Sequence, residues 1–252
     1  MVITYLLLIF IILSFLIIFS LKPKKTEDKN LSFKTNSDLY DKEYATIYDT
    51  IHYDYYRVQK DLTILEPTTT PDSSVLDIGS GTGVHVNELN KKGIHCIGID
   101  DSTAMIQYSK KYKQYYIKGD VLNMGAFHPE TFSHITCFYY TFYYIENKEQ
   151  LLYNIHQWLM PDGLFIVHLT TKCNFGQPNV VSPQFSYKRK IKDNKVYETI
   201  TYPKKTVRNE HTFYMESIPF IVELAKKQGF SVESKDNYDL HNWIYVFKKD
   251  NL

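Results

Sequence analysis

The sequence predicts an α/β fold in which short apolar strands alternate with amphipathic helices and pair into a mostly parallel sheet. An apolar run at 75–78 leads into a glycine-rich turn and then into a helical pattern at 84–92. Further apolar runs follow at 94–99, 115–118 and 132–138, with helix-like or polar stretches between them. This alternation is typical of crossover connections between parallel strands, which place ligand sites at the carboxyl ends of the strands.

Composition narrows the class of protein. The chain has 252 residues, which suits one domain of ordinary size and an additional segment. The net charge of +1 gives no strong electrostatic case for a nucleic-acid partner. Cys96, Cys137 and Cys173 show neither metal-site nor disulfide spacing, so we predict a reducing compartment and no metal site.

The N-terminal segment predicts a membrane anchor. Residues 2–21 are apolar without a charged side chain, and roughly 20 such residues span a bilayer as a helix. Three lysines between residues 22 and 25 follow the segment, so we expect the following domain to face the cytoplasm. A cleaved signal peptide is the alternative, although it would begin with a positive region and end at a small-residue cleavage site. We predict a tether over 22–37 and a folded domain over 38–252.

The glycine-rich turn predicts a ligand that approaches the backbone. Gly79, Gly81 and Gly83 alternate directly after a strand, where a missing Cβ allows close approach. A dinucleotide fingerprint would need a further glycine at the position of Val84. The acid Asp77 immediately before the turn favours a cationic ligand over a pyrophosphate.

This stretch closely resembles the first motif of the class I S-adenosylmethionine-dependent methyltransferases. Gly98, Asp100 and Ser102 match the family's G-x-D-x-S pattern after the second strand, and Gly119-Asp120 matches its acid after the third. The resemblance implies a Rossmann-like, doubly wound sheet of seven strands with S-adenosyl-L-methionine as cofactor. It also implies methyl transfer by in-line attack on a sulfonium, in which the protein mainly positions the reactants.

The resemblance also implies roles for individual residues. Asp100 would accept hydrogen bonds from the ribose hydroxyls, and Asp120 with the backbone of Val121 would bind adenine. Met105 would pack on the adenine ring, with ordinary helix core as the alternative. The predicted cofactor-binding residues are Asp77, Gly79, Ser80, Gly81, Asp100, Ser102, Met105, Asp120, Val121, Phe138 and Tyr48.

The acceptor side is less defined. A tyrosine-containing helix around 44–49 resembles the lid helix of small-molecule methyltransferases, or it simply packs on the domain. An aromatic run at 139–145 stands where many family members carry two histidines, so no general base is evident. Our candidates for the substrate side are His168, His211, Tyr48 and Tyr143, with a structural role as the alternative for His168.

An insertion over about 172–213 interrupts the alternation of strands and helices. Two β-patterned runs, 186–192 and 195–202, flank Asp193-Asn194 and predict a β-hairpin. In small-molecule methyltransferases such an insert caps the substrate site. Its basic residues either meet an anionic group or form a solvated face; they are Lys188, Arg189, Lys190 and Lys192.

The chain is expected to rejoin the main sheet around Glu210–Tyr214. A last helix at 217–228 and strands at 230–235 and 243–248 complete the predicted sheet.

The function predicted from these features is methyl transfer to a small-molecule or lipid-like acceptor by a membrane-tethered enzyme. A non-catalytic protein that binds the cofactor or a partner is one alternative. A protein or RNA methyltransferase is another. The near-neutral charge counts against RNA, and no Asn/Asp-Pro-Pro-Tyr motif follows the fourth strand.

Overall fold

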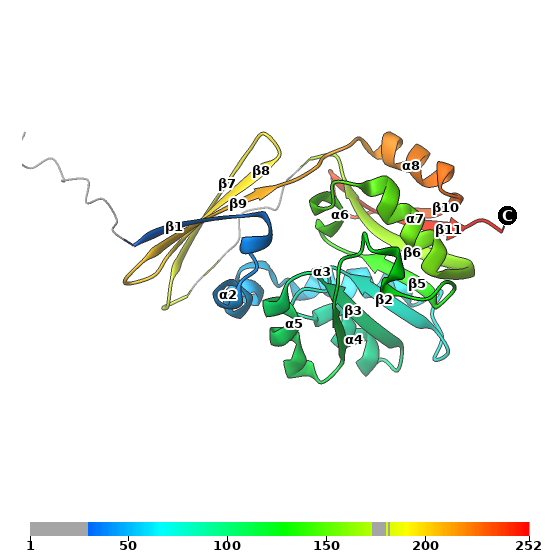
Figure 1. The fold of residues 1–252 in the computed structure, drawn as a ribbon, viewed down its shortest axis with the longest axis horizontal. Helices are drawn as coiled ribbons and strands as arrows, with labels where there is room; N and C mark the ends of the chain where they lie inside the picture. Colours follow the sequence, from blue (N-terminus) through cyan, green and yellow to red (C-terminus); the bar gives the residue numbers. More distant parts are fainter. Residues whose placement is uncertain (1–29, 173–179, 181, 252) are drawn as a thin grey trace, which may run out of the picture.

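A twisted sheet of seven strands forms the centre of the part of the chain that the structure describes (Figure 1). The computed structural model describes residues 30–172, 180 and 182–251. The strand order is β10-β11-β6-β5-β2-β3-β4, and pairing is parallel from β6 to β4 and antiparallel where β11 joins. The predicted α/β class and mostly parallel sheet are confirmed. The strands are β2 (Ser74–Ile78), β3 (His95–Asp100), β4 (Tyr115–Lys118), β5 (Phe132–Cys137), β6 (Leu159–Thr170), β10 (Phe230–Asn237) and β11 (Asn242–Lys249).

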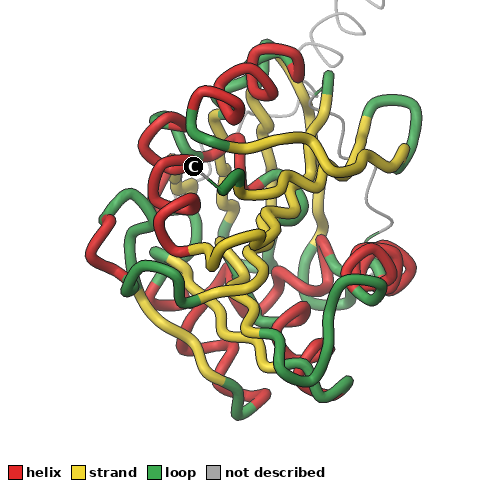
Figure 2. The backbone as a smooth tube through the Cα atoms, turned by 90° about the vertical axis from the view of Figure 1, so that its right-hand side faces the viewer, coloured by secondary structure: helices red, strands yellow, loops and turns green. Residues whose placement is uncertain are grey.

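Helices cover both faces of this sheet (Figure 2). One apolar cluster contains Trp158 and Phe165, and another contains Leu62 and Val75; all four side chains are buried. Burying such a side chain contributes about 1.5–3 kcal/mol, so these clusters hold the helices on the sheet. The helices are α2 (Lys42–His52), α3 (Tyr55–Leu65), α4 (Val84–Lys91), α5 (Thr103–Ser109), α6 (Thr141–Tyr144), α7 (Lys148–Trp158) and α8 (Ile218–Lys227), with 3₁₀ turns η1 (Asn36–Asp38), η2 (Lys110–Tyr112) and η3 (Met124–Ala126).

Helix starts follow their capping residues. Ser217 accepts a hydrogen bond from the Phe220 N–H at the start of α8. Asn147 accepts one from the Gln150 N–H at the start of α7. Such caps satisfy N–H groups that a helix leaves unpaired, which is why the sequence located these two helix starts well.

A second sheet of four strands stands beside the first, in the order β1-β9-β8-β7 (Figure 1). The predicted hairpin is confirmed, because β7 and β8 pair antiparallel around Asp193 and Asn194, which both take positive φ as a tight hairpin turn requires. The strands are β1 (Leu31–Thr35), β7 (Ser186–Lys192), β8 (Lys195–Thr201) and β9 (Thr206–Thr212). We call this four-stranded sheet the insert sheet.

Two predicted boundaries are wrong in this region. Residues 206–212 pair with β8, so the chain does not rejoin the main sheet around Glu210–Tyr214. The predicted tether over 22–37 ends too late, because Leu31–Thr35 forms β1 and pairs in parallel with β9. β1 is an edge strand with mostly exposed side chains, so it lacks the apolar alternation that would have revealed it.

No helix among the described residues is long and apolar enough to cross a bilayer. The predicted anchor, residues 2–21, lies outside the described residues.

We expect a chain that starts at residue 36 to be less stable than one that starts at residue 30. The shorter chain loses the pairing of β1 with β9. Lost cross-strand pairs of this extent cost about 2 kcal/mol, which lowers the melting temperature by about 4–8 °C. Thermal unfolding followed by circular dichroism measures the difference, and equal melting temperatures would contradict a structural role for β1.

Candidate active site

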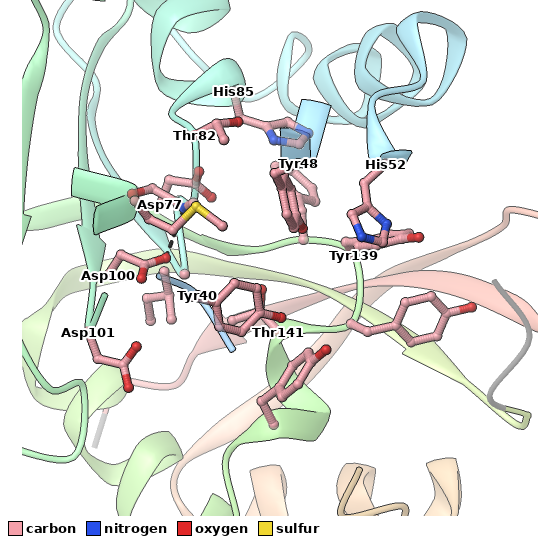
Figure 3. A pocket seen from close by; sticks show the side chains of 18 of the residues that line it. Tyr40, Tyr48, His52, Asp77, Thr82, His85, Asp100, Asp101, Tyr139 and Thr141 are labelled. Carbon is pink, nitrogen blue, oxygen red and sulfur yellow. Dashed lines mark hydrogen bonds between the residues drawn. The ribbon is translucent and has the colours of Figure 1, made fainter. Parts of the chain in front are cut away.

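A pocket of about 350 Å³ lies at the carboxyl ends of β2, β3 and β5, between the main sheet and the insert sheet. The strand ends supply acids on one side of this pocket, and α2 supplies Tyr48 and His52 on the other (Figure 3). Residues of the insert sheet, including Glu198 and His211, complete the lining. The pocket therefore has a side built by the strand-end motifs and a side built by long-range contacts. We call them the cofactor half and the acceptor half.

The glycine turn forms the floor of the cofactor half. Gly79 has a φ of +66°, and a Cβ placed on it would lie 2.2 Å from Cγ2 of Thr141. A side chain at this position would therefore be strained and would clash with α6. The Gly81 N–H donates to Asp100 Oδ2 at 2.9 Å, which ties the turn to the end of β3.

Two buried acids flank the turn. Asp77 accepts a hydrogen bond from Thr136 Oγ1 at 2.8 Å, and its burial raises its pKa. Asp100 accepts backbone N–H bonds from Gly81 and Ser102, both at 2.9 Å, yet its burial raises its pKa to about 6. Each oxygen of Asp100 retains a lone pair, so the carboxylate can still accept two hydroxyl groups.

The structure places most of the predicted cofactor residues on the lining of the pocket. They are Asp77, Gly79, Ser80, Gly81, Asp100, Met105, Asp120, Val121, Phe138 and Tyr48.

Ser102 is outside this lining. Its hydroxyl accepts from the Met105 N–H at 3.1 Å as the cap of α5 and donates to the Tyr40 carbonyl at 2.6 Å. Ser102 therefore positions its neighbours. The neighbouring Asp101, which the sequence motif leaves without a role, lines the pocket (Figure 3).

Helix α2 is held over the glycine turn. Thr82 Oγ1 donates to Asp49 Oδ1 at 2.6 Å, and Lys111 Nζ donates to Asp49 Oδ2 at 2.9 Å. Tyr48 and His52 on the same helix line the pocket. These contacts favour the lid interpretation of α2 over simple packing.

The acceptor half contains a buried carboxylate that the sequence motifs did not reveal. Glu198 on β8 is 1% exposed and accepts hydrogen bonds from Tyr44 Oη at 2.7 Å and Asn209 Nδ2 at 3.2 Å. Tyr187 Oη also donates to it, and Nε2 of His211 lies 2.9 Å from Oε2. Burial raises the pKa of Glu198, but His211, His52 and the hydrogen bond from Tyr187 outweigh burial and hold the pKa below its usual range.

His211 links this carboxylate to a tyrosine on the wall of the pocket. Its Nδ1 lies 2.7 Å from Tyr144 Oη, while its Nε2 faces Glu198. Nε2 makes no aligned hydrogen bond among the described residues, although it lies 2.9 Å from the carboxylate. Because an ionised Glu198 can only accept, the carboxylate favours the tautomer of His211 with its proton on Nε2. Nδ1 then accepts from the Tyr144 hydroxyl. In the resulting carboxylate–imidazole–phenol chain the carboxylate orients the imidazole as a base. The chain can therefore take up a proton at the pocket.

Two other candidates for the substrate side lie outside the lining of the pocket. His168 is buried against Tyr238, its nitrogens have no hydrogen-bond partner among the described residues, and burial lowers its pKa to about 4. Tyr143 Oη donates to the Thr170 carbonyl at 3.0 Å and accepts from the Thr170 N–H at 2.9 Å. The next residue, Tyr144, lines the pocket in its place.

Sequence reasoning missed one arginine on the lining, Arg57 of α3, and named Arg189 of β7 only among four basic residues that either meet an anionic group or form a solvated face. On β7 the half-buried residues Tyr187, Arg189 and Ile191 alternate with exposed lysines. A strict period of two along the hairpin would have separated Arg189 from Lys188, Lys190 and Lys192. Arg57 lies on α3, where neither a motif nor an alternation in the sequence marks it as a pocket residue.

The fold and the acids at three strand ends define a protein that binds a cationic nucleoside-like ligand. A buried polar atom supports the fit, because Ser80 Oγ in the glycine turn has no hydrogen-bond partner among the described residues. Asp77 and the turn would hold the amino-acid end of S-adenosylmethionine, Asp100 its ribose, and Asp120 with Met105 its adenine.

Comparisons with known proteins give the same class. Residues 76–167 match the family model of the methyltransferase domain. A carboxy-S-adenosyl-L-methionine synthase of Nautilia profundicola is 25% identical over 204 residues, which are 76% of this chain and 86% of that protein.

Solved structures share the fold. An S-adenosylmethionine-dependent methyltransferase of Clostridium acetobutylicum has a TM-score of 0.65 at 18% identity, covering 83% of this chain and 98% of that one. A Burkholderia thailandensis 1,6-didemethyltoxoflavin-N1-methyltransferase, with S-adenosylhomocysteine bound, has a TM-score of 0.51 at 15% identity, covering 79% of this chain and 80% of that one. Residues 76–167 thus match a methyltransferase domain, which supports an S-adenosylmethionine-dependent methyltransferase, an enzyme whose cofactor is S-adenosylmethionine. The solved structures show that the fold is shared.

We expect the affinity for S-adenosylhomocysteine to be full above pH 6 and to fall by about tenfold per unit below it. The pKa of Asp100 is about 6, so the carboxyl is protonated below that pH, whereas ribose hydroxyls bind the ionised form better. Asp100→Asn should bind about 100-fold more weakly at pH 8, since it loses hydrogen bonds to a charged group. Calorimetric titration of the full chain between pH 5 and 8 measures both effects.

The matched control is Asp72→Asn, which changes an exposed acid far from the lining of the pocket. It should reproduce the wild-type profile, while Asp100→Asn should show a flatter one. An unchanged affinity in Asp100→Asn would refute the ribose role of this residue.

Proposed function

We propose that this methyltransferase modifies a small molecule that binds in the acceptor half of the pocket. The observation that supports this is the continuity of the cavity from the glycine turn to Glu198 and His211 of the insert sheet. A volume of about 350 Å³ that the insert sheet closes suits a small acceptor better than a segment of a macromolecule. The cavity is lined by tyrosine rings, and aromatic rings favour a planar acceptor. These tyrosines include Tyr40, Tyr48, Tyr139 and Tyr144.

The residues of the acceptor half suit an acceptor whose nucleophile arrives with a proton. S-adenosylmethionine supplies a methyl group on a sulfonium that is already activated toward nucleophiles. The protein therefore has to orient the acceptor and take its proton. In our proposal the Tyr144 hydroxyl passes its own proton to Nδ1 of His211 and takes the proton of the acceptor. Glu198 stabilises the imidazolium that forms, because it lies 2.9 Å from Nε2.

We expect His211→Gln to reduce the turnover rate by about 100-fold or more, the usual contribution of a positioned base. The acceptor is first identified by incubating the enzyme with labelled S-adenosylmethionine and a metabolite and lipid extract. Initial rates on the labelled species then compare the variant with wild type. Affinity for S-adenosylhomocysteine should stay within about twofold, since His211 lies outside the predicted cofactor residues.

His168→Gln is the matched control, because it changes the buried histidine outside the lining. Its rate should stay close to wild type if circular dichroism shows a folded chain. A rate loss in His168→Gln with none in His211→Gln would reverse the assignment. If the extract yields no labelled small molecule or lipid, the proposed function is refuted.

The proposal includes a location. Residues 2–21 have the length and the lack of charge of a membrane-spanning helix, and the lysines that follow favour a cytoplasmic catalytic domain. A lipid-like acceptor near the bilayer is the variant of the proposal that this anchor favours.

We expect the full chain to sediment with membranes and to resist extraction at alkaline pH, because a spanning helix is held by burial of apolar surface. A chain that starts at residue 30 should remain in the supernatant. Immunoblots of the two fractions make the comparison. Recovery of both chains in the supernatant would contradict the anchor.

A further inference from the structure

Charges of opposite sign line the two halves of the pocket. The cofactor half carries Asp77, Asp100 and Asp101 (Figure 3), with Asp120 at the end of β4. The acceptor half carries the guanidinium groups of two arginines, Arg57 and Arg189. A cationic cofactor matches the first half, and the second half calls for a ligand of the opposite charge.

The acid of the acceptor half, Glu198, pairs with Arg189 in the register of β7 and β8 and has further partners. Glu198 is engaged by Tyr44, Tyr187, Asn209 and His211. The two guanidinium groups share this half of the lining with Glu198, and the lining of the pocket also includes Glu146. His52 contributes no charge, because burial lowers its pKa to about 3.

Arg57 is held in place beside the pocket, and although burial lowers its pKa, Tyr139 and the buried Asp61 nearby raise that pKa and favour the ionised form. Its Nη2 donates to the His52 carbonyl at 2.9 Å, and its Cζ lies 3.9 Å from the centre of the Tyr139 ring. Its Nε is buried without a hydrogen-bond partner among the described residues, which also place no carboxylate within ion-pair distance of it. An arginine fixed in this way against an aromatic ring presents a planar set of donors to an anion.

Arg189 approaches the same place from the insert sheet. Its Nε donates to Tyr187 Oη at 3.0 Å, and its Nη2 lies 3.4 Å from His52 Nδ1. His52 thus contacts both arginines, one through its carbonyl and one through its ring. The two guanidinium groups therefore flank one residue of α2 although α3 and β7 lie far apart in the sequence.

Tyr139 lies beside His52 and Arg57 and is conformationally strained (Figure 3). It follows β5 directly and has a φ of +58°, a region that bulky residues avoid. Such strain costs about 1–3 kcal/mol and clusters at ligand sites. Here it holds an aromatic ring under Arg57, where a planar acceptor can meet both the ring and the guanidinium group.

We propose that the methyl acceptor carries a carboxylate or a phosphate group, and that Arg57 binds this group together with Arg189. This inference rests on the proposed function, because it names the chemical class of the small molecule. The anion would accept hydrogen bonds from the two guanidinium groups and would place a negatively charged acceptor beside the cationic cofactor.

Calorimetry on the full chain saturated with S-adenosylhomocysteine tests the inference. The probes are 4-hydroxybenzoate, phenyl phosphate and the uncharged 4-hydroxybenzamide. We expect at least one acid to bind about tenfold more tightly than the amide, because hydrogen bonds to charged groups are the stronger ones. The preferred acid distinguishes a carboxylate from a phosphate.

Arg57→Gln should remove this preference and leave binding of S-adenosylhomocysteine unchanged. Arg208→Gln is the matched control, because Arg208 is exposed on the outer face of the insert sheet. It should keep the wild-type preference. Arg57→Lys, which retains the charge without the fork of donors, should keep only part of it.

Three results would each overturn the inference: equal binding of the amide, no binding of either acid, or an undiminished preference in Arg57→Gln. The labelled product of the extract gives a separate readout, since it should be retained on an anion exchanger at neutral pH. A neutral or cationic product would refute the anionic acceptor and leave the proposed function standing. An extract without any labelled product refutes the proposed function itself.

Discussion

The buried carboxylate of Glu198 is the contact on which the acceptor half depends. It lies on β8, yet its hydrogen-bond partners come from α2 through Tyr44 and from β9 through His211. A carboxylate buried without partners would cost several kcal/mol, so the insert sheet is stable against α2 only when all of these donors are in place. Because the folded pKa of Glu198 is lowered, this stabilisation is present above its unfolded pKa and is lost as the pH falls through the folded value.

The cofactor half shows how much a sequence can predict when geometry follows from local pattern. Asp77, Asp100 and Asp120 each follow or end a short apolar strand, and parallel strands bring their carboxyl ends to one edge. The motif therefore located the lining without any knowledge of packing. Ser102 is the exception among the predicted cofactor residues, because its hydroxyl caps α5. This role is also local, but the family resemblance did not distinguish a helix cap from a ligand-binding residue.

The acceptor half could not be predicted in the same way. Glu198 and His211 meet on neighbouring strands of the insert sheet. Tyr44 reaches Glu198 only when this sheet docks on α2, and no spacing in the sequence encodes that contact. The aromatic run at 139–145 indicated a cleft, but the choice between Tyr143 and Tyr144 depends on the orientation of one short helix, α6. β1 was missed for a related reason, since its partner β9 is 175 residues further along the chain (31 pairs with 206).

The cofactor half and the acceptor half of the pocket therefore respond to substitutions in different parts of the chain. The cofactor half is specified by residues within a few positions of each strand end, so substitutions there alter S-adenosylmethionine binding directly. The acceptor half is specified by side chains on the insert sheet, α2 and α3, which meet the cofactor half chiefly at Tyr48 and Tyr139. New side chains on β7, β8 or β9 can thus change the charge and shape offered to the acceptor while the glycine turn stays intact. This separation gives a physical reason why one fold serves many acceptors, and why the identity of the acceptor has to be sought in Arg57, Arg189 and Glu198 rather than in the motifs.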